Sequence, residues 1–82
     1  MPRLQVRVGL LPVETWEEEA GQWVTYVPTL NNISTFGSTQ REALARTRAM
    51  MRDYIESMEA EGLPLPLTEA ERRELLTTLR RS

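Results

Sequence analysis

Side chains that could carry out catalysis are few in this sequence, and the commonest ones are missing. The 82 residues include no histidine and no cysteine, so the usual proton shuttle and the usual thiolate nucleophile and metal ligand are absent. Ser34, Ser38 and Thr39 carry hydroxyl groups, but a hydroxyl nucleophile needs an adjacent base to activate it. The glycines form neither a phosphate-binding loop nor a dinucleotide-binding motif. We therefore predict no enzymatic activity, no catalytic residue, no cofactor and no metal site.

Three consecutive glutamates, residues 17–19, form a short acidic run. Adjacent carboxylates on a flexible loop do not converge on one cation, because sites for hard cations space their oxygen ligands differently. We interpret the run as the solvated tip of a hairpin. Attraction of a basic partner is the alternative.

The basic residues are ten arginines and no lysine, and the formal net charge is −2. Residues 41–82 carry as many arginines as acidic residues, and the two signs alternate along the chain, which is typical of solvated helix faces. Near the N-terminus, Arg3 and Arg7 are too few to bind a nucleic-acid backbone firmly. The charge pattern therefore does not predict a nucleic-acid-binding protein.

Length and composition predict one small folded domain. A chain of 82 residues with 40% hydrophobic and 27% charged residues can form one core, and its composition is not that of a disordered protein. The apolar run at residues 10–13 is much too short to be a signal peptide or to span a bilayer. We expect a cytoplasmic protein.

The first half of the chain has the pattern of a β-sheet. Alternating apolar residues between 4 and 10 predict a half-buried strand, and Pro12 is expected to end its pairing. The polar residues 14–21 are expected to form a hairpin connection. Residues 22–27 are aromatic and β-branched and predict a second strand, and residues 33–36 predict a short third strand. The expected sheet is a three-stranded antiparallel meander.

The second half of the chain has the pattern of two helices. Thr39 and Glu42 have the spacing of a capping box, in which the Thr hydroxyl accepts from the Glu amide and the Glu side chain returns to the Thr amide. The helix is expected to extend to residue 61 and to stop at Gly62, with its methionines as core residues. A second capping box at residues 68–71 opens a short C-terminal helix. The fold class is therefore α+β, with a β-β-β-α domain at residues 1–66 and a helical tail at residues 67–82.

One predicted strand is apolar on both faces. Trp23 and Val27 point to one side of it, and Val24 and Tyr26 point to the other. A single helix covers only one face of a three-stranded sheet, so the uncovered aromatic side chain must contact the C-terminal helix, another copy of the chain or a different protein. We expect a homo-oligomer and take as the candidate interface residues Trp23, Val24, Tyr26 and Phe36.

The residues from Trp23 to Leu44 resemble the pattern of the HicB-like antitoxin family. In that family an aromatic strand ends in a Pro-x-Leu step, here Pro28-Thr29-Leu30, and a short strand leads into Gly-Asp-Thr, here Gly37-Ser38-Thr39. A helix then opens with Glu-Ala, here Glu42-Ala43. The resemblance covers residues 3–66, with departures at residues 31–32 and at Ser38, where the family often has Pro-Gly and Asp. Each motif residue also has a physical role. Pro28 stops the strand and Gly37 allows a flexible turn. Thr39 caps the helix, Glu42 makes the return bond of the cap, and Ala43 allows close contact between the helix and the sheet.

The resemblance implies a partial RNase-H-like β-β-β-α domain without nuclease activity. It also implies a function in a bacterial toxin–antitoxin system, in which the protein binds and neutralises a HicA-type RNA-cleaving toxin. Many members add a C-terminal DNA-binding domain, but only 15 residues follow Leu67 here, so we expect no DNA binding by this protein alone.

Two alternatives remain at the sequence level. A sheet with exposed aromatic residues can stack single-stranded bases, so a nucleic-acid-binding module is one alternative, although basic charge around Trp23 and Tyr26 is missing. An orphan domain that oligomerises without a toxin partner is the other.

Overall fold

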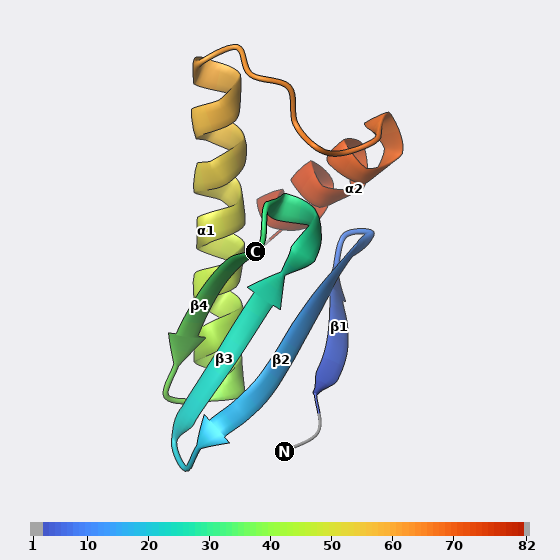
Figure 1. Cartoon of the computed structure of the whole chain (residues 1–82). Helices are drawn as coiled ribbons and strands as arrows, with labels where there is room; N and C mark the ends of the chain where they lie inside the picture. The colour runs from blue at the N-terminus through green and yellow to red at the C-terminus, as the bar shows by residue number, and fades with distance from the viewer. Residues whose placement is uncertain (1–2, 82) are drawn as a thin grey trace.

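The protein has two layers, a four-stranded antiparallel sheet and a layer of two helices on one of its faces, in a computed structural model that describes residues 3–81 (Figure 1). The strands pair in chain order, β1-β2-β3-β4, so β1 and β4 are the two edges of the sheet. The elements are β1 (Leu4–Val8), β2 (Leu11–Glu19), β3 (Gln22–Val27), a 3₁₀ turn η1 (Pro28–Leu30), β4 (Ile33–Gly37), α1 (Gln40–Ala60) and α2 (Glu69–Arg80).

The α+β class is confirmed, but the expected number of strands is wrong. The sheet has four strands because β2 includes most of the segment expected to be a hairpin connection. Its glutamates lie on or near a face that is open to solvent, so their charge does not disfavour a strand. Pro12 does not end the pairing: it lies opposite Arg7 of β1, at a point where β2 has not yet begun to pair with β3, so its missing N–H breaks no ladder bond on that side.

The core lies between the inner face of the sheet and the two helices. Leu11 and Val13 of β2 are fully buried there, and Val27 of β3 is buried beside them. Both helices contribute to the same apolar cluster, α1 through Met51 and Ile55 and α2 through two leucines. The buried members of the cluster are Val8, Leu11, Val13, Val27, Leu30, Met51, Ile55, Leu75 and Leu79.

A row of threonines positions the first half of α1 on the sheet. Thr15, Thr25 and Thr35 lie opposite one another on three adjacent strands. The hydroxyl groups of Thr25 and Thr47 share a buried hydrogen bond, and the Thr47 hydroxyl also donates to the Ala43 carbonyl at 2.8 Å. Because an unpaired buried hydroxyl group is costly, the Thr25–Thr47 pair favours one position for α1 across β3, although the neighbouring Thr15 hydroxyl is buried without a hydrogen-bond partner.

The first turn of α1 is capped, but the capping hydrogen bonds involve both Ser38 and Thr39 and not Thr39 alone. As expected, the Thr39 hydroxyl accepts a hydrogen bond from the Glu42 amide at 3.0 Å. The expected return bond to the Thr39 amide is wrong: the Glu42 carboxylate accepts from the backbone N–H of Ser38 at 3.0 Å and from its hydroxyl at 3.2 Å. The family-typical Asp position, here Ser38, therefore takes part in the cap.

Replacing Thr39 by Ala is expected to lower the free energy of unfolding by about 1 kcal/mol, the usual cost of losing a hydroxyl N-cap. Thermal melts followed by circular dichroism measure the change. Thr77→Ala is the matched control, because Thr77 is exposed inside α2, where Ala is the better helix former. Equal melting temperatures for Thr39→Ala and the wild type would show that this cap does not hold α1.

Two arginines of α1 connect the elements instead of only solvating the helix surface. Arg46 donates to the Phe36 carbonyl of β4 at 3.1 Å, and Arg52 donates to the Leu79 carbonyl near the end of α2 at 2.8 Å. Arg46 also lies 3.5 Å from the Glu42 carboxylate, as its i,i+4 spacing predicts. These bonds attach α1 to the edge of the sheet on one side and to α2 on the other.

The C-terminal helix covers the inner face of the sheet. The capping box at its start is confirmed: the Thr68 hydroxyl accepts from the Glu71 amide, and the Glu71 carboxylate accepts from the Thr68 amide. Leu75 and Leu79 of α2 are buried in the common core. Because α2 packs on the inner face, it does not cover the side of β3 that carries Val24 and Tyr26.

Candidate functional site on the open face of the sheet

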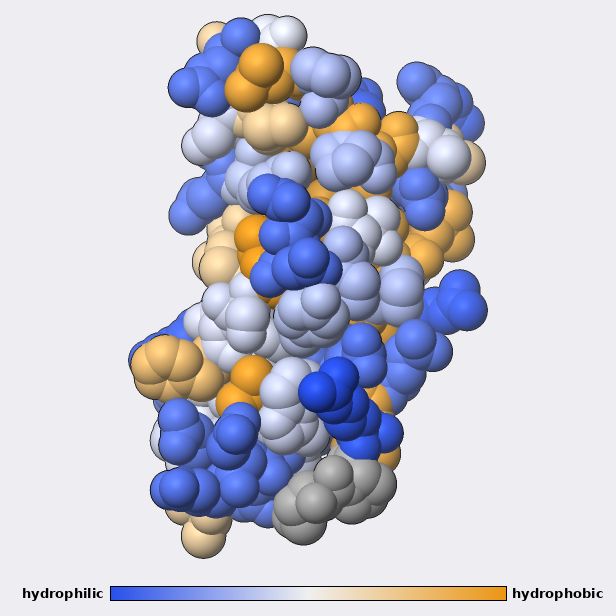
Figure 2. Space-filling model, viewed as in Figure 1, coloured by the Kyte–Doolittle hydropathy of each residue, from blue (hydrophilic) through white to orange (hydrophobic). Residues whose placement is uncertain are grey.

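The face of the sheet opposite the helices carries no other element of the described chain (Figure 1). We call it the open face, and Figure 2 shows it from the front. Side chains alternate between the two faces of each strand, so the inward direction of the core residues fixes which residues point outward. The open face consists of Arg3, Gln5, Arg7, Pro12, Glu14, Trp16, Glu18, Val24, Tyr26, Ser34 and Phe36.

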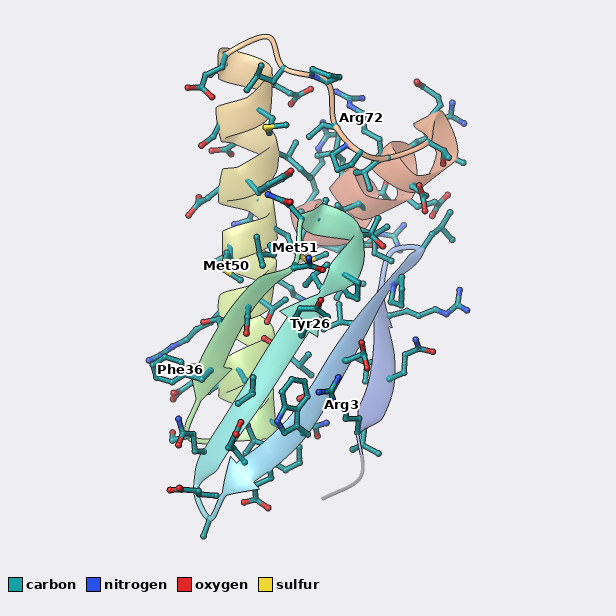
Figure 3. The ribbon with its side chains drawn as sticks, in the orientation of Figure 1. Arg3, Tyr26, Phe36, Met50, Met51 and Arg72 are labelled. Atoms are coloured by element: carbon teal, nitrogen blue, oxygen red, sulfur yellow. The ribbon has the colours of Figure 1, made fainter. Side chains whose placement is uncertain are left out.

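One row of side chains crosses the whole open face. Trp16 lies opposite Val24, and Val24 lies opposite Phe36. At the other end of the row the Arg3 guanidinium lies over the Trp16 ring, 4.3 Å from its centroid. The Phe36 side chain is 57% exposed and projects from the β4 edge (Figure 3). The row Arg3–Trp16–Val24–Phe36 is therefore a cation–π pair continued by two apolar side chains.

A second row lies beside the first. Glu14 lies opposite Tyr26, and Tyr26 lies opposite Ser34. The Tyr26 hydroxyl donates to the Asn32 side chain at 2.6 Å, which holds the ring along the sheet. The Glu14 carboxylate lies 3.4 Å from the Arg3 guanidinium, so the cation that stacks on Trp16 is paired with an acidic side chain of the same face. Neither row presents an unpaired positive charge to the centre of the face.

Charge is unevenly distributed along the chain. Residues 8–40 hold four glutamates and no basic residue, so this segment of the sheet has a net charge of −4 within a protein of net charge −2. All four glutamates belong to β2, and residues 20–40 carry no charge at all. The open face is therefore divided into a charged half, on β1 and β2, and an uncharged half, on β3 and β4.

The β2–β3 hairpin carries most of the negative charge at one end of the molecule. We call residues 17–21 the hairpin tip. The Glu17 carboxylate accepts from the Gly21 amide at 3.3 Å, and the Glu18 carboxylate accepts from the Trp16 indole at 3.2 Å. No ion pair within residues 3–81 involves a glutamate of the tip. The acidic run thus lies at a hairpin tip, with Glu18 and Glu19 exposed and with no basic partner among the described residues.

A hollow of about 490 Å³ lies between the hairpin tip, the end of β4 and the first turns of α1. Phe36 and Arg46 line it, together with Glu42. The backbone N–H of Ser38, the Ser38 hydroxyl and the Arg46 charge hold the pKa of Glu42 below its usual value. The ionised Glu42 carboxylate is thus favoured by its cap partners, and its charge is paired with that of Arg46.

Comparison with known proteins assigns the chain to a family. It is 36% identical over 55 residues to UPF0150 protein Ta0767 of Thermoplasma acidophilum, and the match covers 67% of this chain and 80% of the relative. The chain belongs to the UPF0150 family. No profile of a known protein family matches this UPF0150 chain, and no solved structure matches it significantly.

The structure brings three of the four candidate interface residues of this UPF0150 chain together. Val24, Tyr26 and Phe36 share the open face, whereas Trp23 points to the inner side and is half-buried there. Arg3 and Trp16 also lie beside these residues. Their place could not be predicted, because residues 14–21 were expected to form a loop and not part of a strand. The alternation of the buried residues Leu11, Val13 and Thr15 was the signal for a strand.

The motif residues lie where the chain changes direction, between β3 and α1. Pro28 opens η1 directly after β3, and Thr39 and Glu42 form the cap of α1. We expected a glycine at position 37 because it would allow a flexible turn. This explanation is wrong, because Gly37 is not among the glycines with positive φ. Its place is fixed by packing: a Cβ atom at Gly37 would lie 2.7 Å from the backbone nitrogen of Ala43.

Other kinds of site find no support in the described residues. Within residues 3–81, no group of three or more acidic, histidine or cysteine side chains is placed to hold a metal ion. In the same part of the chain, no helix has the length and apolar character needed to cross a bilayer. The open face and the hairpin tip are the surfaces on which a functional proposal can rest.

Proposed function

We propose that this UPF0150 protein is a HicB-like antitoxin module that binds and neutralises a HicA-type RNA-cleaving toxin by protein–protein contact. Two findings support the proposal. The motif residues from Pro28 to Ala43 resemble the HicB-like pattern, and the UPF0150 family is related to HicB-like antitoxins.

The observation that carries the proposal is the uncompensated negative charge of the hairpin tip. A toxin that cleaves RNA must present a basic surface to the phosphate backbone of its substrate. A surface of that kind is complementary to Glu17, Glu18 and Glu19, which have no basic partner in the described chain. Charge complementarity speeds association and selects the partner, and contact at the basic surface would exclude RNA from the toxin.

The same charge distribution disfavours the nucleic-acid-binding alternative. A module that stacks single-stranded bases on aromatic side chains also needs a basic groove that follows the phosphate backbone. The sheet segment at residues 8–40 has a net charge of −4 and no arginine. On the open face, Arg3 and Arg7 are balanced by Glu14 and Glu18, so it offers no basic groove, and we expect no binding of RNA or DNA by this protein alone.

We expect this protein to suppress RNA cleavage by a short basic toxin encoded in the adjacent reading frame, at a one-to-one ratio of chains. Glu18→Arg combined with Glu19→Arg is expected to weaken toxin binding about tenfold, because it reverses the charge of the contact. Isothermal titration with purified toxin gives the affinities, and a cleavage assay on single-stranded RNA gives the neutralisation.

The matched control changes the net charge by the same amount at the other end of the molecule. Glu61 follows the last turn of α1 and Glu74 lies in the middle of α2, and both are exposed. Glu61→Arg combined with Glu74→Arg therefore changes helix surface far from the hairpin tip (Figure 1). This control is expected to bind toxin like the wild type. Failure of the wild type to bind the toxin contradicts the proposed function, and equal weakening by both double variants contradicts the contact at the hairpin tip. Sequence-dependent DNA binding by the protein alone would support the nucleic-acid alternative.

A further inference from the structure

A hollow of about 300 Å³ lies between α1 and α2, the two helices of the helix layer (Figure 1). Each helix contributes four residues to its lining. The apolar ones are Ile55, Leu76 and Leu79. Ile55 and Leu79 are buried in the common core, and Leu76 is half-buried against it. The hollow therefore has an apolar floor that is continuous with the core of the protein.

The other residues of the hollow are charged. They are three arginines and two glutamates, so the hollow carries a net charge of +1. Arg72 and Glu59 neutralise each other, because the guanidinium lies 2.5 Å from the carboxylate. The remaining three, Arg52, Glu56 and Arg80, take part in no ion pair within residues 3–81. The excess positive charge thus belongs to Arg52 and Arg80.

Arg52 is directed toward the end of α2 and not toward its neighbour on α1. Its i,i+4 spacing to Glu56 would allow an ion pair on the helix surface. The structure shows instead that Arg52 donates to the Leu79 carbonyl at 2.8 Å. That bond uses one of the five N–H donors of a guanidinium. Arg80 follows Leu79 directly and makes no hydrogen bond within the described residues, so two guanidinium groups with free donors, one from each helix, line the hollow.

We propose that this hollow binds a small carboxylate that carries a short apolar chain. The carboxylate accepts from Arg52 and Arg80, because a planar guanidinium group matches an acceptor with two oxygens. The apolar chain lies against Leu76. A monoanion neutralises the net charge of +1, whereas a phosphate monoester, with a charge of about −1.5 to −2 at neutral pH, leaves an excess of negative charge. This small-molecule site is separate from the hairpin tip and does not rest on toxin binding.

The volume of the hollow limits the size of the ligand. A water molecule in the liquid occupies about 30 Å³, so a hollow of about 300 Å³ has room for roughly ten non-hydrogen atoms. Hexanoate is within this limit and serves as the probe. Because the hollow is at the lower end of the range of about 300–1,000 Å³ for ligand sites, we expect a dissociation constant of about 1 mM.

A titration with hexanoate, followed by two-dimensional NMR of the isotope-labelled protein, tests the site. The amide signals expected to shift are those of the facing helix segments, residues 52–59 and 72–80. Arg80→Gln is expected to weaken binding about fivefold, and Glu56→Gln to strengthen it about threefold, because exposed charge pairs change affinity by up to about fivefold. Both residues are exposed, so the variants keep the fold. Arg52 is left unchanged because it attaches the end of α2 to α1.

Arg73→Gln and Glu74→Gln are the matched controls, because both residues are exposed on α2 and do not line the hollow. They are expected to bind hexanoate like the wild type. Hexanol, which lacks the charge, and acetate, which lacks the chain, are both expected to bind more weakly than hexanoate. Absence of shifts at about ten times the expected dissociation constant overturns the proposal. Equal binding of hexanol overturns the carboxylate contact, and equal weakening by Arg73→Gln and Arg80→Gln overturns its location.

Discussion

Gly9→Ala is expected to destabilise the protein by about 2–5 kcal/mol, through two effects that add. Gly9 lies in the turn between β1 and β2 with a φ of +63°, which costs an L-residue about 1–2 kcal/mol. A Cβ atom there would also lie 2.9 Å from the Cα atom and 3.0 Å from the nitrogen of Leu75. Forced overpacking of this kind costs about 1–3 kcal/mol. The contacted atoms belong to the backbone, so no rotamer change relieves the clash.

The result expected in a thermal melt is a fall of about 8–40 °C, because 1 kcal/mol corresponds to about 4–8 °C in a domain of this size. Gly21→Ala is the matched control. Gly21 also has a positive φ, +80°, but nothing lies within 4 Å of its Cβ position. Gly21→Ala is expected to lose only the free energy that a positive φ costs an L-residue. Equal melting temperatures for the two variants would contradict the close contact between the β1–β2 turn and α2.

This contact matters because α2 closes the core. Leu75 and Leu79 are buried against the β1–β2 end of the sheet, and Arg52 donates to the Leu79 carbonyl from α1. If α2 moves away from Gly9, both leucines are exposed while the open face on the other side of the sheet is not touched. We therefore expect Gly9→Ala to lower stability without changing the residues of the open face.

The sequence is informative for elements whose pattern depends on local physical chemistry. Period-two alternation located β1 and β3, and the hydroxyl–glutamate spacings located the starts of both helices. The full capping box at Thr68 is confirmed to the atom, whereas at Thr39 the returning carboxylate bonds to Ser38. The spacing of Thr39 and Glu42 shows which side chains can take part in the cap. Whether the Glu42 carboxylate bonds to the amide of residue 38 or to that of residue 39 depends on the direction in which the chain enters the helix.

The strand β2 was missed because its outward residues are polar for a reason that only the fold supplies. Pro12, Glu14 and Glu18 point to the open face, and solvent on that side tolerates both proline and charge. The inward residues, Leu11 and Val13, kept the strand pattern. Because β2 was missed, Trp16 and Arg3 were missed too, and the row that crosses the face to Phe36 could not be predicted from the sequence.

Gly37→Ala is expected to cost about 3 kcal/mol, the upper end of the usual penalty for overpacking. The last residue of β4 packs directly under the first turn of α1, and an added Cβ would lie 2.7 Å from the nitrogen and 3.1 Å from the Cα atom of Ala43. To make room, α1 would have to move away from the sheet. That movement would also separate Thr47 from Thr25, because their buried hydrogen bond fixes the same part of α1.

Urea denaturation gives the free energy of unfolding for this variant, and a double variant identifies the cause. Ala43→Gly removes a side chain but not the backbone atoms that Gly37 approaches, so Gly37→Ala with Ala43→Gly is expected to be no more stable than Gly37→Ala alone. Recovery in the double variant would mean that the Ala43 methyl group causes the clash. An unchanged midpoint for Gly37→Ala would mean that α1 does not rest on β4. If the expected loss is found, the family-typical glycine at this position is explained by the approach of two backbones, and the glycine is needed even though its φ suits any residue.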